Sequence, residues 1–355
     1  MIVGVVREVK EAEGRVALTP AGAAELARAG HTVLVERGAG FDARFADPEY
    51  ERAGATLLGV DEVWGQSELL LKVKEPIEPE FGRLREGLTL FTYLHLAAAP
   101  ALTEALRGSG TVAIAYETVA AADGTLPLLA PMSEIAGRLA TQAGAYFMQA
   151  PMGGSGTLIG GAPGVAPARM VVIGGGAVGI NAARVGVGMG ADVTILDRDL
   201  PRVRKLEEYF GPSARVVASD ATTLAEYAGA ADLIVGAVLV PGASAPKLID
   251  AELLAGMRRG TVVVDVAIDQ GGCSVASRPT THGDPVFDVG GVLHYCVANM
   301  PGAVPATSTR ALTNATLPYV LRLAGLGIEE ALETDPEIAA GLNVRGGELA
   351  HPALV

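Results

Sequence analysis

Two side chains suited to proton transfer follow apolar segments that are typical of buried strands. His95 ends the run 88–94, and Asp269 lies in a glycine-rich stretch shortly after the run 261–264. Ligands of parallel α/β sheets collect at the carboxyl ends of strands, and histidine is the side chain most easily poised for proton transfer near neutral pH. His95 and Asp269 are therefore candidates for acid–base chemistry. The alternatives are a strand-end histidine with satisfied hydrogen bonds and a turn-capping aspartate.

Basic side chains stand in comparable positions. Lys72 and Lys74 close the run that begins at Leu69, and the period of two in a strand predicts both on one face. Arg15 lies in the first strand-to-helix connection, where it could form a bidentate pair with a carboxylate. This pattern suits anion binding at a sheet edge. The alternatives are a solvated edge and an ordinary surface arginine.

The strongest single motif is a glycine turn. Gly174, Gly176 and Gly179 form a GxGxxG pattern between the apolar segment 169–173 and a helix rich in small residues that begins at Ala177. The first glycine permits a tight turn, the second lets the backbone approach a pyrophosphate, and the third allows close contact between helix and strand. The amino end of the helix adds N–H groups that bind phosphate. The pattern predicts a dinucleotide site.

An acidic residue at the end of the next strand indicates which dinucleotide. Asp197 lies at the expected distance of about 20 residues from the glycines, where a carboxylate accepts hydrogen bonds from the ribose 2′-hydroxyl. The acid would repel a 2′-phosphate, so NAD is favoured over NADP. Arg198 and Arg202 nearby leave an alternative, because an arginine can bind a 2′-phosphate.

Composition limits the class of protein. The chain has 355 residues and a mass of 36.2 kDa, with 40 acidic and 27 basic residues and a net charge of −13. This charge disfavours nucleic acid and anionic membranes as partners. The two cysteines, Cys273 and Cys296, are too few for a disulfide framework or a zinc cluster, and no metal motif is present. No segment resembles a signal peptide or a membrane span, so a cytoplasmic protein is expected.

The elements that must position these side chains alternate between strand and helix in two successive series. The first holds expected strands at 2–6, 32–36, 69–73, 88–94 and 111–116 and a helix at 20–29 with Thr19 as its N-cap. The second follows a long helix, 133–149 with Ser133 as N-cap, and a loop, 151–167. Its expected strands are 170–173, 192–196, 216–218, 233–235 and 262–264, and a last helix covers 307–324. Strands separated by helices predict an α/β fold with two Rossmann-like, doubly wound, mostly parallel sheets.

Taken together, several segments in the same order resemble the alanine dehydrogenase family, which includes the related transhydrogenase alpha subunit. The matching segments are 4–10, 15–20, 71–76, 91–95, 131–138, 153–154, 265–272 and 297–305. The resemblance implies reversible oxidative deamination of L-alanine by NAD to pyruvate and ammonium. It also implies a homohexamer, and an NAD domain, 126–304, inserted into a substrate domain made of 1–125 and 305–355.

The resemblance assigns roles to matched positions. Arg15 and Lys74 would bind the substrate carboxylate beside Tyr93, His95 would be the general acid/base, and Asp269 would assist proton transfer. The cofactor would contact Ser133, Gly174, Gly176, Ala177, Val178, Gly179, Asp197, Arg202, Ser219, Val238, Leu239, Ile268, Asn299 and Met300. Ser244 departs from relatives that often carry lysine there. A non-catalytic NAD(H)-binding subunit of a transhydrogenase-like complex and a dehydrogenase of another small amino acid are the alternatives.

Overall fold

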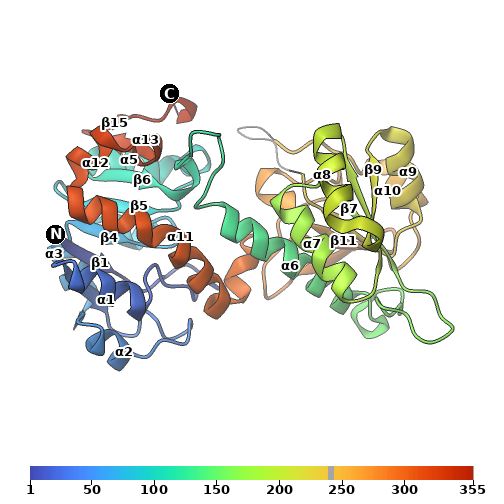
Figure 1. The fold of residues 1–355 in the computed structure, drawn as a ribbon, viewed down its shortest axis with the longest axis horizontal. Helices are drawn as coiled ribbons and strands as arrows, with labels where there is room; N and C mark the ends of the chain where they lie inside the picture. The colour runs from blue at the N-terminus through green and yellow to red at the C-terminus, as the bar shows by residue number, and fades with distance from the viewer. Residues whose placement is uncertain (239–243, 355) are drawn as a thin grey trace. The chain divides into compact units, whose positions relative to one another are not determined.

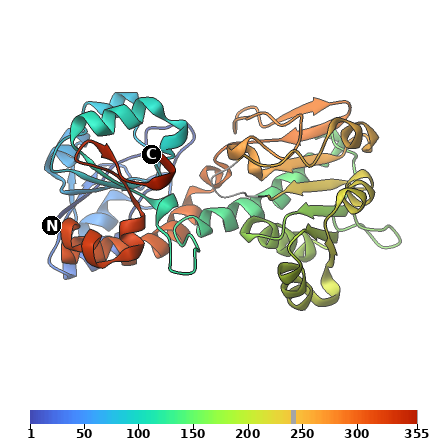
Figure 2. The same cartoon turned by 90° about the horizontal axis from the view of Figure 1, so that it is seen from above.

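A computed structural model describes residues 1–238 and 244–354. By its internal contacts the chain divides into two compact units, the first made of Met1–Met132 with Gly302–Val355 and the second of Ser133–Pro301. Each unit is a mostly parallel sheet with helices on both faces (Figures 1 and 2). The predicted fold class, two doubly wound α/β sheets, is therefore confirmed.

The sheet of the first unit has eight strands among the described residues, in the order β15-β14-β6-β5-β4-β1-β2-β3. The strands are β1 (Ile2–Val5), β2 (Thr32–Glu36), β3 (Thr56–Leu58), β4 (Leu69–Leu71), β5 (Thr89–Thr92), β6 (Val112–Ala115), β14 (Leu342–Arg345) and β15 (Glu348–Leu349). The first six run parallel, and β14 and β15 add an antiparallel edge. The order reverses between β1 and β4, and ligands of doubly wound sheets bind at such a switch point.

The helices of the first unit cover both faces of this sheet. They are α1 (Pro20–Arg28), α2 (Asp47–Arg52), α3 (Val60–Gln66), α4 (Glu78–Phe81), α5 (Pro100–Ser109), α11 (Pro305–Leu326), α12 (Ile328–Thr334) and α13 (Pro336–Ala340), with 3₁₀ turns η1 (Leu96–Ala98), η2 (Tyr116–Thr118) and η7 (Pro352–Leu354). As predicted, α1 begins at Pro20 with Thr19 as its N-cap, whose side chain accepts a hydrogen bond from the amide of Gly22. The amide of Val16 donates to the buried hydroxyl of Thr309 on α11, which ties the carboxyl-terminal part of the chain to this unit.

The second unit repeats the same topology. Its sheet has seven strands in the part of the chain that the structure describes, ordered β12-β13-β11-β10-β7-β8-β9, with only β12 antiparallel. The strands are β7 (Arg169–Ile173), β8 (Asp192–Asp197), β9 (Arg215–Ala218), β10 (Leu233–Gly236), β11 (Val262–Asp265), β12 (Val286–Val289) and β13 (Val292–Tyr295). The helices are α6 (Ala130–Phe147), α7 (Ala177–Gly188), α8 (Leu200–Phe210), α9 (Ala221–Gly229) and α10 (Ala251–Gly256), with 3₁₀ turns η3 (Ala150–Met152), η4 (Gly211–Ser213), η5 (Val266–Gln270) and η6 (Met300–Ala303).

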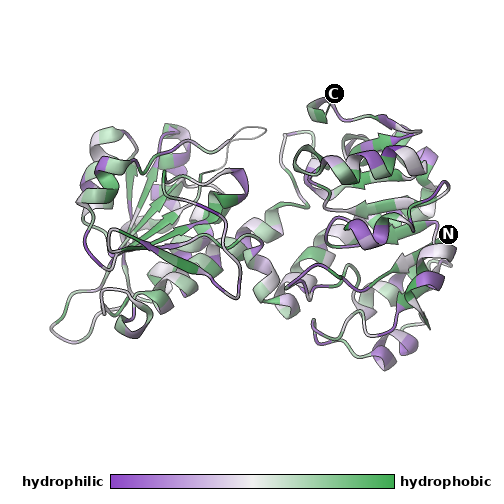
Figure 3. Ribbon diagram, turned by 180° about the vertical axis from the view of Figure 1, so that it is seen from behind, coloured by the Kyte–Doolittle hydropathy of each residue, from purple (hydrophilic) through white to green (hydrophobic). Residues whose placement is uncertain are grey.

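Alternate side chains of the central strands supply two cores. On β7, Met170 and Val172 pack with α6, α7 and α8, whereas Val171 and Ile173 pack with α9 and α10. The central strands of both sheets, such as β4 and β10, are accordingly continuous apolar runs, whereas strands nearer the edges carry some polar residues (Figure 3). Parallel strands that are buried on both faces need such continuous runs. No helix among the described residues is long and apolar enough to cross a membrane.

Two local predictions are wrong. The long helix begins at Ala130, so Ser133 lies inside its first turn and is not the N-cap. Strand β4 ends at Leu71, before either lysine, so the rule that alternate strand residues share a face does not apply to Lys72 and Lys74. The backbone still bonds to the neighbouring segment there, since the amide of Lys72 donates to the carbonyl of Phe91, and the side chain of Lys72 is completely buried.

Lys72 is held between two acidic side chains. Its ammonium lies 3.1 Å from Glu8 and 2.9 Å from Glu80, and all three side chains are buried. Glu8 also accepts a hydrogen bond from the amide of Val73, so it joins the connection after β1 to the end of β4. Burial raises the pKa of Glu8, and the charge of Lys72 opposes this rise. Lys72 is thus neither a solvated edge residue nor an anion-binding one.

Replacing Lys72 by methionine should destabilise the protein strongly, since it leaves two buried carboxylates without a counter-charge. We expect a loss of about 3–5 kcal/mol in the free energy of unfolding, measured by denaturant titration. The raised pKa of Glu8 would rise further without Lys72. Ionising a carboxyl whose pKa is raised in the folded state destabilises the protein. The deficit of Lys72→Met should therefore grow as pH rises from the ordinary pKa of a glutamate towards the raised pKa of Glu8. Lys205→Met, at an exposed position on α8, is the control. A deficit equal to that of the control would contradict the prediction.

Candidate active site

The imidazole of His95 stands at the carboxyl edge of the first sheet in an unusual backbone conformation. The chain leaves β5 at Thr92, and His95 adopts a left-handed conformation with φ of 50°. Glu117, which follows the neighbouring strand β6, fixes this turn: one carboxylate oxygen accepts hydrogen bonds from the amides of His95 at 2.6 Å and Leu94 at 3.1 Å. The imidazole Nδ1 lies 3.8 Å from the same oxygen, and 48% of the side chain is exposed. An acid–base group is thus oriented yet open to a ligand.

Tyr93 lies beside His95 with its ring parallel to the imidazole, 5.9 Å away between centroids. Its hydroxyl donates to the carbonyl of Leu128 at 2.6 Å, and its ring meets Tyr116 edge-on. Burial raises the pKa of the phenol although the charge of Arg15 opposes this rise. Tyr93 therefore places a buried aromatic ring beside His95, with its hydroxyl bonded to Leu128.

Arg15 is not an ordinary surface arginine, because only 2% of it is exposed. Its Nε donates to Glu13 at 2.6 Å and a second donor, Nη2, reaches the other oxygen of Glu13, which is the bidentate pairing that the sequence left open. Burial lowers the pKa of Arg15, but the hydrogen bonds and charge of Glu13 outweigh this and raise it overall. Nη1 lies 3.0 Å from the sulfur of Met132, a weak acceptor. Glu13 thus fixes the guanidinium, and the sulfur near its Nη1 is a weak hydrogen-bond acceptor.

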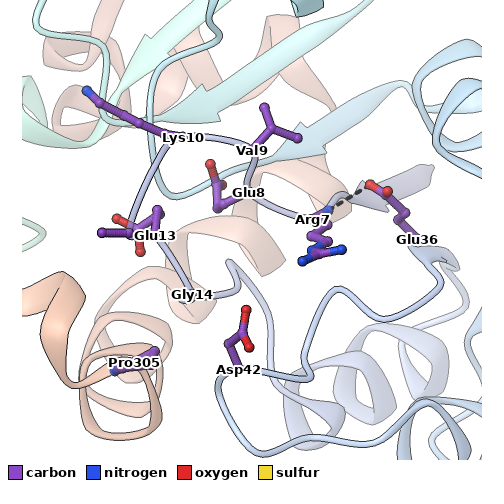
Figure 4. A pocket seen from close by; sticks show the side chains of 10 residues that line it. Arg7, Glu8, Val9, Lys10, Glu13, Gly14, Glu36, Asp42 and Pro305 are labelled. Atoms are coloured by element: carbon purple, nitrogen blue, oxygen red, sulfur yellow. Dashed lines mark hydrogen bonds between the residues drawn. The ribbon is translucent and has the colours of Figure 1, made fainter. Parts of the chain in front are cut away.

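A cavity of about 700 Å³ opens beside these ion pairs, along the connection that follows β1. Figure 4 shows Glu8, Glu13 and Asp42 around it, with Arg7 bonded through its backbone to Glu36. Glu8 and Glu13 are the partners of Lys72 and Arg15, so the acidic members of both ion pairs line the cavity. Lys74 follows β4 and is half-buried, in contrast to Lys72.

The glycine turn of the second unit has the geometry that the motif predicts. Gly174 has a φ of 99°, a backbone conformation that residues other than glycine rarely adopt. A Cβ on Gly179 would lie 1.8 Å from the carbonyl oxygen of Gly174, so the third glycine permits the contact between helix and strand. A Cβ on Gly176, the residue before α7, would meet nothing within 4 Å. Open space therefore lies next to the first amides of α7, at Ala177 and Val178, where a pyrophosphate fits.

Asp197, the acidic residue of the motif, ends β8 and is bonded to the glycine turn. Only 4% of it is exposed, and it accepts hydrogen bonds from the amides of Gly175 at 2.7 Å and Asp199 at 2.8 Å. The guanidinium of Arg202 lies 3.2 Å from the same carboxylate and 3.7 Å from that of Asp199. Arg202 is therefore engaged by two acids, an arrangement that suits a ribose diol better than a 2′-phosphate.

The remaining predicted cofactor positions are distributed around the same sheet edge and on α6. Ser219 follows β9 and its amide donates to the carbonyl of Asp197, and Val238 follows β10. Asn299 has φ of 60°, its carbonyl lies 3.2 Å from Nε2 of His282, and buried Met300 begins η6. Leu239 lies outside the described residues. Ser133 lies on α6, which packs on α7 where Thr141 bonds to the carbonyl of Ala182.

Asp269 is exposed on η5, the 3₁₀ turn that follows β11, and Ile268 beside it is buried. The acid that caps the turn is Asp265, whose side chain accepts from the amide of Ala267. Asp269 is therefore not the turn-capping aspartate of the alternative interpretation, and its exposed carboxylate has no capping role. Among the described residues no group of histidine, cysteine and acidic side chains could hold a metal ion.

The structure thus brings Arg15, Tyr93 and His95 to one edge of the first unit and the glycine turn and Asp197 to one edge of the second. Sequence analysis missed Glu13 and Glu117, the partners of Arg15 and His95. Glu117 carries the same signal as His95, since it follows an apolar run. A Rossmann-type unit with this glycine turn, combined with a second α/β unit that carries an exposed histidine at its sheet edge, is typical of pyridine-nucleotide-linked dehydrogenases.

Comparison with known proteins identifies the family. Residues 4–136 match the family model for the N-terminal domain of alanine dehydrogenase/PNT, and residues 140–352 match the model for its C-terminal domain. The chain belongs to the alanine dehydrogenase/PNT family. An alanine dehydrogenase of Mycolicibacterium smegmatis is 55% identical over 355 residues, which cover 100% of this chain and 96% of that protein.

Solved structures agree with this assignment. One described as an L-alanine dehydrogenase is 50% identical, with a TM-score of 0.97 over 100% of this chain and 98% of that one. A transhydrogenase from Sinorhizobium meliloti is 25% identical, with a TM-score of 0.84 over 99% of this chain and 100% of that one. The match to the dehydrogenase is therefore better in both sequence and structure.

Replacing Gly179 by alanine should disrupt the dinucleotide turn, because the new methyl group would overlap the carbonyl of Gly174. We expect NADH to bind at least about tenfold more weakly, a loss of about 1.4 kcal/mol, as measured by NADH fluorescence. Gly188→Ala is the matched control: it lies on the same helix, and its Cβ would meet nothing within 4 Å. Equal affinities of the two variants would count against the turn as the cofactor site.

Proposed function

We propose that this protein is an NAD-dependent L-alanine dehydrogenase. It converts L-alanine, NAD⁺ and water reversibly to pyruvate, ammonium, NADH and a proton. The observation that carries the proposal is identity of about half over the whole chain to proteins named alanine dehydrogenase. The open imidazole of His95 and the NAD-type turn supply the chemistry that this reaction needs.

The substrate domain, 1–125 with 305–355, binds the carboxylate of alanine or pyruvate through Arg15 and Lys74. Arg15 is held in one orientation by Glu13, and a fixed guanidinium presents a planar set of donors that matches a carboxylate. Tyr93 forms a neutral wall beside the reacting carbon. A carboxylate held in this way fixes the orientation of C2, and positioning of this kind contributes about 7–11 kcal/mol in well-oriented reactions.

Proton transfers are assigned to His95 and Asp269. In deamination His95 takes the first proton of the water that adds to C2 of the iminium. As the carbinolamine collapses, its hydroxyl gives up the second proton, and the departing amino group takes up both protons through His95 and Asp269 and leaves as ammonium. NAD, bound in domain 126–304, supplies the hydride acceptor. The positions assigned to it are Ser133, Gly174, Gly176, Ala177, Val178, Gly179, Asp197, Arg202, Ser219, Val238, Leu239, Ile268, Asn299 and Met300.

The second candidate is a non-catalytic NAD(H)-binding subunit of a transhydrogenase-like complex. The likeness to the Sinorhizobium meliloti transhydrogenase favours it. Such a subunit needs no proton-transfer group and no carboxylate site of its own. The oriented, exposed His95 and the buried Arg15 therefore favour the enzyme. A dehydrogenase of another small amino acid would share all of these groups, and the amino-acid panel below distinguishes it.

The proposal predicts NADH formation with L-alanine, measured at 340 nm on a panel of L-amino acids that includes glycine and serine. His95→Ala and Asp269→Ala should each lower turnover by about 10²–10⁴-fold, the usual contribution of general acid–base catalysis. NADH binding should persist in both variants, and His31→Ala, at the turn after α1, should behave as wild type. Preference for another amino acid would redirect the substrate assignment. Near-normal turnover of either variant would refute its role.

We further propose that the chain forms a homo-oligomer, a hexamer as the family resemblance implies, and functions in the cytoplasm. Large apolar side chains of the second unit support association: Leu158 is 67% exposed and Val165 is 65% exposed on the long loop after η3. Burying such residues between copies of the chain would stabilise the assembly. Light scattering should give six times 36.2 kDa. A monomer mass would contradict this expectation.

A further inference from the structure

One charged side chain caps the amino end of the short 3₁₀ turn that bears Asp269, and another binds the backbone just past its carboxyl end. At its amino end, the buried carboxylate of Asp265 accepts a hydrogen bond from the amide of Ala267 at 3.1 Å. At its carboxyl end, η5 stops at Gly271, whose φ is 89°. A positive group binds the backbone that follows this end.

The positive group is Lys247, which lies more than twenty residues before η5 ends. Its ammonium donates to three backbone carbonyls of the segment that follows Asp269, those of Gly271, Gly272 at 2.9 Å and Ser274 at 3.1 Å. An ammonium has three donors, and all three are used here. Lys247 is largely exposed, so this convergence on carbonyls is not imposed by burial.

Neighbouring contacts join the same two segments. The amide of Ala245 donates to Gln270 at 2.9 Å, and that of Leu248 donates to Cys273 at 2.7 Å. From inside the fold, Asp265 accepts from the amide of Cys273 at 2.7 Å. The loop 271–274 is therefore held between a buried anion and an exposed cation.

We infer that Lys247 is a positioning residue for Asp269. It fixes the carboxyl end of η5, so that the exposed carboxylate of Asp269 has one position. The inference rests on the proposed catalytic role of Asp269. No step of the proposed reaction uses the charge of Lys247, and its donors are directed at backbone that moves with Asp269. Removing the ammonium leaves the fold intact and allows the carboxylate to shift.

The test compares Lys247→Met with Lys205→Met, a second exposed lysine of the same unit. In Lys247→Met the kcat for L-alanine oxidation should fall about 10- to 100-fold, the effect of a small misplacement of a reacting group. The KM for L-alanine and the Kd for NADH should stay within about twofold of wild type, since Arg15, Lys74, the glycine turn and Asp197 lie outside η5, and Ile268 on η5 is held by burial. Lys205→Met should match wild type throughout.

Hydrogen exchange supplies a readout independent of turnover. The amides of Gly271 and Gly272 bond within η5, so peptides covering 266–275 should exchange faster in Lys247→Met and as in wild type in Lys205→Met. Lys247→Arg, whose planar donors reach at least two of the carbonyls, should restore most of the kcat and of the protection.

Three outcomes separate the hypotheses. Unchanged kcat and unchanged exchange in Lys247→Met overturn the inference. A loss of NADH affinity equal to the loss of kcat also overturns it, because Lys247 would then serve the cofactor site. If the wild-type protein does not oxidise L-alanine, the proposed function fails and the assignment of Lys247 to catalysis fails with it, whereas an exchange difference would still establish the loop clamp.

Discussion

Charge buried at the carboxyl edge of a sheet must be compensated, and this requirement governs the functional edge of both units. In the first unit the compensation is ionic: Arg15 is enclosed with Glu13, and Lys72 lies between Glu8 and Glu80. In the second unit it comes mostly from backbone amides, which surround the carboxylates of Asp197 and Asp265. An unpaired charge in such a place costs several kcal/mol. The same pairing that stabilises these groups also fixes their directions, so the edges are rigid where ligands are proposed to bind.

The sequence predicts the strands and the dinucleotide turn well because both depend on local pattern. Continuous apolar runs mark parallel strands buried on both faces, and the glycines at 174, 176 and 179 have steric reasons that hold wherever the turn occurs. Asp197 follows from spacing alone. The rule that functional residues follow strand ends singles out His95. The structure places this residue at the edge of a sheet, half-exposed and with a fixed backbone.

What the sequence does not predict is which charges pair. Glu13 is two residues from Arg15, Glu117 is 22 residues from His95, and Glu8 is 64 residues from Lys72. Only the three-dimensional arrangement of strand ends brings the last two pairs together. The wrong prediction for Lys72 has the same origin. Strand β4 ends at Leu71, one residue before Lys72, so the rule that alternate strand residues share a face does not reach Lys72. Sequence spacing likewise does not show which of Asp265 and Asp269 caps the turn. The folded backbone decides it, because the amide of Ala267 points at the carboxylate of Asp265.

The division of the chain into units has a consequence for biosynthesis. The second unit is one uninterrupted stretch, 133–301, whereas the sheet of the first unit gains β14 and β15 only from the last residues of the chain. As the polypeptide emerges from the ribosome, the dinucleotide-binding half can complete its sheet while the earlier half still waits for its closing helix, α11, and its edge strands. The nascent amino-terminal segment thus stays incomplete until residues 302–349 have been made, with apolar strands that require shielding until then.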